Sequence, residues 1–317
     1  MEKHNKTSDF ILLGFTDGPY NHRALFLFIL VIYTHTWLGN VLLLSAIRLS
    51  QRLHKPMYFF LGNLSFLDIC FSTVIVPKLL STVLHGVTFI SFFGCFLQLY
   101  FFVSLGVTEI LLLAVMALDR YLAICNPLHY TSVMNKTVCI TLVIGCWVTA
   151  ALHSFLHSYM ALFCLNYCED RLIHHFFCDM TSLLKLACSS TTANELLIFT
   201  EGSMAIIIPF LLVLVSYILI AHAIFKLKTS TNRSKAFSSC SSHLTVICLF
   251  YGTIIFMYFR PPSSYSPSYD RIVSLAYTVI TPMLNPYIYS LRNKDVKKSL
   301  KKSVMQLSSC YKIKESF

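Results

Sequence analysis

The stretch "ALFLFILVIYTHTWLGNVLLLSAI", residues 24–47, contains no Asp, Glu, Lys or Arg. The hydrocarbon core of a bilayer is about 30 Å thick, and a helix needs about 20 apolar residues to cross it. Residues 24–47 are long enough and apolar enough to do so. This stretch therefore predicts a helix that spans a membrane.

Six further runs repeat this pattern along the chain. Residues 57–77 carry one charge, Asp68, and residues 79–118 carry one, Glu109; residues 137–168, 202–225, 236–259 and 272–291 carry none. The runs are too long for the strands of a β-barrel, and they lack its alternation. The chain is 56% hydrophobic and 12% charged, whereas soluble domains are about 45–50% apolar and about 25% charged. The sequence predicts an all-α membrane protein, a bundle of seven transmembrane helices.

The distribution of Lys and Arg predicts the orientation of the chain. Basic residues cluster between spans one and two, between spans five and six, and after residue 291, and such clusters favour the cytoplasmic side. We expect an extracellular N-terminus at residues 1–23, without a cleavable signal peptide, a membrane domain at 24–291 and a cytoplasmic tail at 292–317. The net charge of +11 reflects this bias, so no nucleic-acid partner is expected.

Two smaller features follow from that topology. Residues 293–302 are basic and amphipathic, which is typical of a short helix lying on membrane lipid. Of the four Asn-X-Ser/Thr sequons, the one at Asn5 alone would face outward, so we expect glycosylation there.

The cysteines on the outer side favour disulfide bonds. Cys95, Cys168, Cys178 and Cys188 fall there, and four cysteines allow three pairings. The run "HHFFC", residues 174–178, is an incomplete ligand set for zinc, so no metal site is predicted. Since no catalytic constellation is assembled either, the chain is not expected to be an enzyme.

Five motifs carry a family resemblance. They are "LHKPMYFFLGNLSFLD" at 53–68, "MALDRYLAICNPLHY" at 116–130, "SY" at 216–217, "KAFSSCSSHL" at 235–244 and "PMLNPYIYSLRN" at 282–293. In this order, over nearly the whole chain, they resemble the olfactory receptors, a branch of the rhodopsin-like G-protein-coupled receptors. The resemblance implies a receptor that binds small, mostly apolar odorants. It also implies a stimulatory G protein of the olfactory type as partner, and a rise in cyclic AMP.

The resemblance also assigns the disulfides and the residues that couple to the G protein. It implies the bonds Cys95–Cys178 and Cys168–Cys188. Placing an Arg within hydrocarbon costs at least about 2.5–3.5 kcal/mol, and the neighbouring Asp119 would reduce that cost for Arg120. The alternative role for Arg120 is a simple anchor at the end of its helix. The residues implied for activation and G-protein coupling are Asp119, Arg120, Tyr121, Tyr217, Lys235, Asn285, Pro286 and Tyr289.

Asp68 and Glu109 are carboxylates deep within predicted spans. Such acids usually face the bundle interior and mark ion or proton sites. The resemblance implies a sodium ion beside them and Asn285; no other cofactor is expected. Two alternatives stay open: a neutral structural carboxylic acid, and a proton relay in a proton-coupled membrane transporter.

The odorant pocket is predicted from helical spacing. Counting back from Arg120 by turns of three and four residues places Phe102, Val103, Gly106 and Val107 on one patch, which the resemblance orients inward. The other residues implied for the pocket are Glu201, Gly202, Ala205, Ile206, Tyr251, Ile254, Ile255, Tyr258 and Thr278. The lining is apolar with sparse hydroxyls, as in many small-molecule sites. Plain helix packing is the alternative for each residue.

Overall fold

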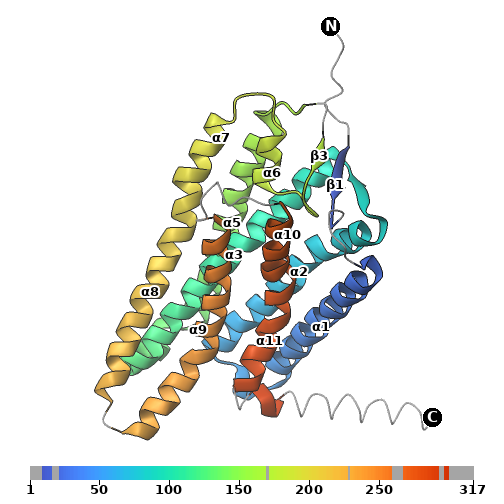
Figure 1. Ribbon diagram of the computed structural model, residues 1–317. Coiled ribbons are helices and arrows are strands. Elements are labelled where there is room, and N and C mark those ends of the chain that lie inside the picture. Colours follow the sequence, from blue (N-terminus) through green and yellow to red (C-terminus); the bar gives the residue numbers. More distant parts are fainter. Residues whose placement is uncertain are drawn as a thin grey trace, which may run out of the picture.

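The computed structural model describes residues 9–15, 21–168, 171–227, 229–258, 267–292 and 296–299. It is a bundle of long helices, with a small group of strands at one end (Figure 1). We call this the sheet end, and the opposite end the Arg120 end. The first four spans are α1 (His22–Leu49), α2 (Pro56–His85), α3 (Phe92–Cys125) and α5 (Lys136–Phe163).

The remaining spans are less regular. The fifth consists of α7 (Thr192–Leu197), a π-helical turn η2 (Ile198–Gly202) and α8 (Ser203–Lys226); the sixth is α9 (Ser230–Tyr258). The seventh consists of α10 (Pro267–Leu275), a second π-helical turn η4 (Ala276–Ile280) and α11 (Thr281–Arg292). The short helices are η1 (Gln51–Leu53), α4 (Pro127–Val133) and α6 (Met180–Lys185).

The prediction of a seven-helix bundle is confirmed. Within the described residues, six helices are long and apolar enough to cross a membrane, and α10, η4 and α11 complete the bundle. Several helices continue beyond the charge-free runs. The fifth span begins at Thr192 rather than at residue 202, and α9 begins at Ser230 rather than at residue 236. Helical hydrogen bonds continue past these charge-free runs, because a charged residue does not end a helix.

Polar side chains and one glycine fix several helix ends. The Asn21 side chain accepts hydrogen bonds from the Arg23 and Ala24 amides at the start of α1. Ser91 and Asn135 do the same for α3 and α5. These side chains satisfy backbone donors that have no partner within the helix. Gly86 follows the C-terminal end of α2 and has a φ of 77°, a backbone conformation that favours glycine.

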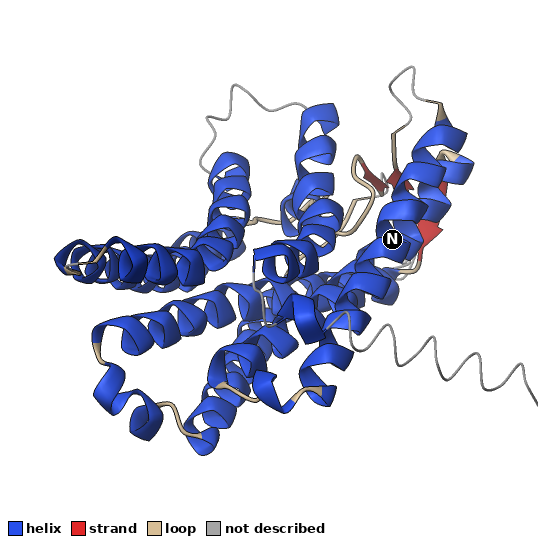
Figure 2. Ribbon diagram, turned by 90° about the horizontal axis from the view of Figure 1, so that it is seen from below, coloured by secondary structure: helices blue, strands red, loops and turns tan. Residues whose placement is uncertain are grey.

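A three-stranded sheet covers the sheet end, and the all-α prediction missed it. The strand β1 (Phe10–Leu13) pairs antiparallel with β2 (Val87–Ile90) and parallel with β3 (Leu172–Ile173). Phe10 and Leu12 are completely buried. Figure 1 shows β1 and β3 at the upper right, and Figure 2 shows the strands in red at one side of an otherwise helical structure. The N-terminal segment is therefore part of the packed structure at this end.

Gly14, directly after β1, lies unusually close to α2. A Cβ atom at Gly14 would be 2.6 Å from Cγ2 of Thr82. The Thr82 side chain cannot rotate away freely, because its hydroxyl contacts the Thr88 hydroxyl at 2.7 Å and the Lys78 carbonyl at 2.8 Å. The buried Arg271 of α10 donates a hydrogen bond to the Gly14 carbonyl. Gly14 thus joins the N-terminal segment to two helices.

We expect Gly14→Ala to lower the free energy of unfolding by about 1–3 kcal/mol, since the added methyl group overpacks a fixed site. The matched control is Gly145→Ala in α5, where an added Cβ would meet nothing within 4 Å. The midpoint of thermal unfolding of purified receptor checks this, and equal midpoints for the two variants would contradict it.

Candidate functional site

Asp119 and Arg120 form an ion pair at the Arg120 end of α3. Nη2 of Arg120 donates to Oδ2 of Asp119 at 2.9 Å, and both residues are buried. The hydroxyl of Tyr130, in α4, donates to the other carboxylate oxygen at 2.7 Å. Both oxygens of Asp119 are therefore engaged. Tyr130 lies within a motif quoted above, but the sequence alone did not assign it this role.

Hydrogen bonds also link the helices around this pair. The Tyr217 hydroxyl of α8 lies 2.8 Å from Nδ1 of His243 in α9, and the Ser242 hydroxyl donates to the Ile288 carbonyl of α11 at 3.2 Å. Tyr289 is buried, and its hydroxyl has no hydrogen-bond partner among the described residues. His243 is a further residue that the sequence analysis did not single out.

Two other residues predicted for coupling are only partly defined. Tyr121 follows the ion pair and is partly exposed. Lys235 lies within α9, but its side chain is outside the described part of the structure. Pro286, by contrast, packs closely on α1: a Cβ at Gly39 would be 3.0 Å from its Cγ.

The predicted acids lie in a polar centre of the bundle. Nδ2 of Asn285 donates to both oxygens of Asp68, at 3.0 and 3.1 Å. Asp68 and Glu109 are both buried. Oε1 of Glu109, Oδ1 of Asn285 and Oδ1 of Asn40 have no hydrogen-bond partner among the described residues. Buried oxygen atoms of this kind are suitable ligands for a hard cation.

An open crevice of about 510 Å³ lies between α3, α5 and α8. The lining residues Leu152, Met204 and Ile208 are 66%, 59% and 51% exposed, so the crevice opens on the outer surface of the bundle. Its lining is almost entirely apolar. The complete lining is Val107, Leu111, Thr149, Leu152, His153, Leu156, Glu201, Met204, Ala205, Ile208 and Pro209.

Three residues predicted for the pocket line this crevice: Val107, Glu201 and Ala205. Other predicted residues contact different neighbours. The ring of Phe102 packs on Phe71 and Phe177, with centroids 5.6 and 4.8 Å apart.

The remaining residues predicted for the pocket lie in different parts of the bundle. A Cβ at Gly106 would meet Phe71 at 4.0 Å. Tyr251, Ile206 and Ile254 pack in the core nearer the Arg120 end, whereas Val103 packs nearer the sheet end. The Thr278 hydroxyl bonds to the Ser274 carbonyl, Gly202 packs near His157 and Ile255 is 46% exposed. Tyr258 ends α9, and its side chain lies outside the described part of the structure. Val107, Glu201 and Ala205 are thus the predicted residues that line the crevice, and the other described ones have the contacts given above.

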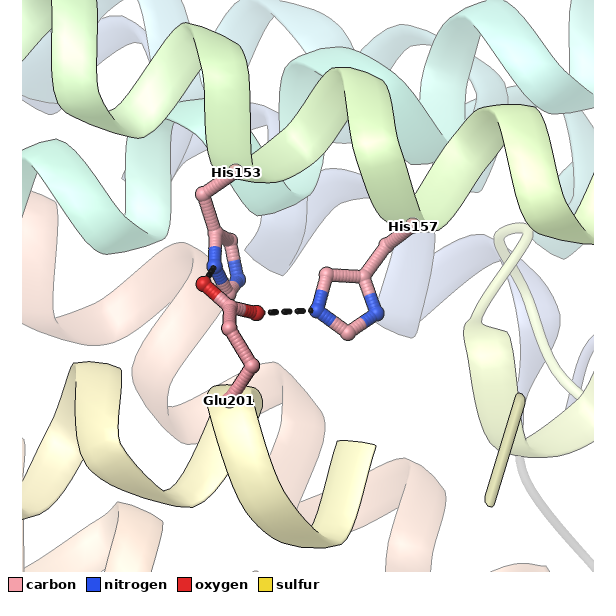
Figure 3. Close-up of side chains that lie close together, drawn as sticks. All are labelled: His153, His157 and Glu201. Carbon is pink, nitrogen blue, oxygen red and sulfur yellow. Dashed lines mark hydrogen bonds and ion pairs between the residues drawn. The ribbon is translucent and has the colours of Figure 1, made fainter. Parts of the chain in front are cut away.

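Glu201 forms a cluster with two histidines at the side of the crevice. Nδ1 of His153 lies 2.6 Å from one carboxylate oxygen, and Nε2 of His157 lies 2.8 Å from the other. Both histidines belong to α5, one helical turn apart, and Glu201 lies in the π-helical turn η2 (Figure 3). The sequence analysis missed both histidines. The signal was the pair of histidines four residues apart in "HSFLH", but Glu201 is 44 residues from His157.

The residues that cover the sheet end are held by two disulfides and a buried histidine. The disulfides are Cys95–Cys178 and Cys168–Cys188, the two pairings that the family resemblance implies. Nε2 of His175 lies 3.2 Å from the Ser274 hydroxyl. Burial, reinforced by the positive charge of Arg271, lowers the pKa of His175 to about 3. The "HHFFC" run thus has structural roles here.

Comparison with known proteins agrees with these features. Six helices long and apolar enough to cross a membrane, with a seventh span that contains Pro286, define a multi-pass helical membrane protein. The family model described as "Olfactory receptor" matches residues 28–307. The chain therefore belongs to the olfactory receptor family.

Individual relatives support this assignment over almost the whole chain. Olfactory receptor 1f45 of Rattus norvegicus is 49% identical, with 95% of this chain and 97% of the relative covered. Olfactory receptor 1L6 of Homo sapiens is 48% identical, with 94% and 86% covered. Olfactory receptor 1E16 of Mus musculus is 47% identical, with 95% and 96% covered.

His175 should make the stability of the receptor depend on pH. Its pKa falls from an ordinary value of 6.5 to about 3 on folding. Below about pH 6.5 the unfolded chain therefore binds a proton at this histidine and the folded chain does not. The free energy of unfolding consequently decreases as the pH falls. At pH 5 we expect a loss of about 2 kcal/mol relative to pH 7.5.

The test compares thermal unfolding of the wild type and of His175→Gln at both pH values. The Gln side chain retains a polar group for Ser274 but does not titrate. The drop in midpoint between pH 7.5 and pH 5 should be smaller in the variant, and an unchanged drop would show that His175 is not its source.

Proposed function

We propose that the chain is a plasma-membrane receptor for small, mostly apolar odorants that activates a stimulatory G protein of the olfactory type and raises cyclic AMP. Family membership over residues 28–307 is the observation that carries this proposal. It favours a receptor over the transporter that Asp68 and Glu109 alone would allow. No enzymatic reaction is part of the proposal.

The sheet end faces outward in this proposal, with the N-terminus outside and the C-terminus in the cytoplasm. Both disulfides lie near the sheet end, and disulfides persist in oxidising compartments outside the cell. The basic residues Arg48, in the last turn of α1, and Arg52 and Lys55, between α1 and α2, lie at the opposite end, as expected for the cytoplasmic side. Asn5, outside the described residues, would then be open to glycosylation.

The crevice between α3, α5 and α8 is the binding site that the geometry favours. Its volume of about 510 Å³ falls within the range of about 300–1,000 Å³ that is usual for small ligands. The lining offers an apolar surface from Val107, Ala205 and their neighbours, with the polar His153–Glu201 pair at one side. Because the crevice opens on the outer surface of the bundle, an apolar odorant would reach it through the lipid.

Activation would act on the contacts at the Arg120 end. Ligand binding shifts a pre-existing equilibrium between two conformations. In the resting conformation, Asp119 holds Arg120, and Tyr130 shares that carboxylate. Because α3 and α8 both line the crevice, and Tyr217 of α8 contacts His243 of α9, a ligand there can bias these helices toward releasing Arg120 for the G protein.

The polar centre fits a sodium ion. Asp68, Glu109 and Asn285 would hold it, since their buried oxygens include Glu109 Oε1 and Asn285 Oδ1, which lack partners among the described residues. The ion would supply positive charge beside two buried carboxylates. The Asn285–Asp68 hydrogen bonds join α2 and α11, and an ion that also bound Glu109 would add α3, so this centre would resist separation of those helices.

Arg120→Ala should abolish the cyclic-AMP response while surface expression and odorant binding remain. Tyr130→Phe should have the opposite effect and raise basal cyclic AMP, because it removes one hydrogen bond that holds the resting carboxylate. Cells that coexpress the olfactory G protein and are screened with an odorant panel provide the measurement. A normal response in Arg120→Ala would overturn the coupling role.

Ala205→Phe should fill the crevice and raise the effective odorant concentration at least about tenfold, equivalent to roughly 1.4 kcal/mol. The control is Val148→Phe, since Val148 is an exposed residue of α5 outside the crevice lining. If both variants give wild-type dose–response curves at equal surface expression, the odorant binds elsewhere.

A further inference from the structure

We propose that His153, His157 and Glu201 bind a divalent transition-metal ion of the zinc type. Among the described residues, they are the group of three His, Cys, Asp or Glu side chains whose ligand atoms come together, all within 4.8 Å of one another. Figure 3 shows both imidazoles projecting from α5 toward the carboxylate on the facing helix. The proposal does not depend on which odorant binds or on where it binds.

The types of ligand atom match those of known zinc sites. Two imidazole nitrogens and one carboxylate oxygen form the protein ligand set of many zinc sites that keep a fourth position open. In this cluster, Glu201 is also part of the crevice lining, and its side chain is 41% exposed. The open position would therefore face the crevice, where water or a ligand can occupy it.

The spacing requires only a small movement. Zinc bonds of about 2.0–2.2 Å in tetrahedral geometry separate ligand atoms by about 3.3–3.5 Å. Glu201 now contacts the two histidines at 2.6 and 2.8 Å, so its carboxylate would retreat by less than about 1 Å. The ligand atoms lie within 4.8 Å of one another, so the widest separation would shorten by at most about 1.5 Å. Rotation of the imidazoles, whose ring centroids are 4.5 Å apart, and of the long, partly exposed Glu201 side chain can supply both movements.

The π-helical turn η2 positions Glu201 for this role. The Ser203 amide bonds to the Ile198 carbonyl, five residues back, which is the π-helical pattern. Such turns occur frequently at functional sites. Next to Glu201, a Cβ atom on Gly202 would lie 3.9 Å from Cε1 of His157, so α5 and this turn are in van der Waals contact.

Charge supplies a further reason. An ionised carboxylate within a membrane span is stabilised by a positive partner. No Lys or Arg is found among the residues that line the crevice. A proton on a histidine or a bound cation can supply that charge, and two imidazoles together favour a transition metal over Na⁺ or Ca²⁺.

The test uses purified receptor in lipid nanodiscs, after removal of any histidine tag. Titration with Co²⁺ should give the visible absorption of a tetrahedral ion at one equivalent, and Zn²⁺ should displace it. His153→Ala, His157→Ala and Glu201→Gln should each weaken Zn²⁺ binding at least about tenfold, equivalent to roughly 1.4 kcal/mol. His129→Ala, in α4, is the control and should bind as the wild type does.

Glu201→His separates loss of the metal from loss of the fold. It replaces one ligand atom with another, so it should bind Zn²⁺ where Glu201→Gln does not. The absence of saturable binding in wild type would overturn the proposal, as would unchanged affinity in all three variants. Because the readout is metal binding, its failure leaves the proposed odorant response untouched, and an absent odorant response leaves the metal site untouched.

Discussion

The structure depends on one constraint: hydrocarbon offers no water for hydrogen bonding, so backbone groups, and most polar side chains of the spans, need partners inside the protein. Helices satisfy the backbone, and the ionisable side chains within the spans follow the same rule. Asp68 accepts from Asn285, Asp119 from Arg120, and Glu201 contacts two histidines. These contacts lie at the centre, at one end and at the side of the bundle. Asp68 thereby links α2 to α11 and Glu201 links η2 to α5, whereas the Asp119–Arg120 pair lies within α3 and reaches α4 through Tyr130.

The seven spans could be predicted because their signal is local and cumulative. Each stretch of about 20 apolar residues is sufficient by itself to predict a membrane-spanning helix, independently of the rest of the chain. The Asp119–Arg120 pair was equally accessible, since its members are adjacent in the sequence. The sheet was not, because β1 has four residues whose partners, β2 and β3, lie far along the chain. A strand that short is recognisable only from its pairing partners, which no local sequence pattern identifies.

The binding site was harder to predict than the spans. Helical periodicity finds one face of a helix, but every face in a membrane bundle is apolar, so periodicity cannot distinguish a face that packs from one that lines a crevice. Phe102 and Val107 show this, because they lie on the same predicted patch and yet only Val107 lines the crevice. The π-helical turns at Ile198–Gly202 and Ala276–Ile280 add a second difficulty. Each shifts the helical phase, so that regular helical spacing cannot be extended across these turns to residues such as Glu201 and Thr278.

In the proposed function, the opening of the crevice on the outer surface of the bundle determines which odorant concentration the receptor responds to. Leu152, Met204 and Ile208 at its edge are the kind of residues that contact acyl chains. Under the same proposal, a site reached through them experiences the concentration of a molecule dissolved in the bilayer, which for an apolar compound greatly exceeds that in the surrounding water. Two compounds that bind the crevice equally well from the bilayer would then differ in potency, measured against their concentrations in water, by the ratio of their partition coefficients. The membrane would act as the first stage of chemical selection, before any side chain of the receptor is touched.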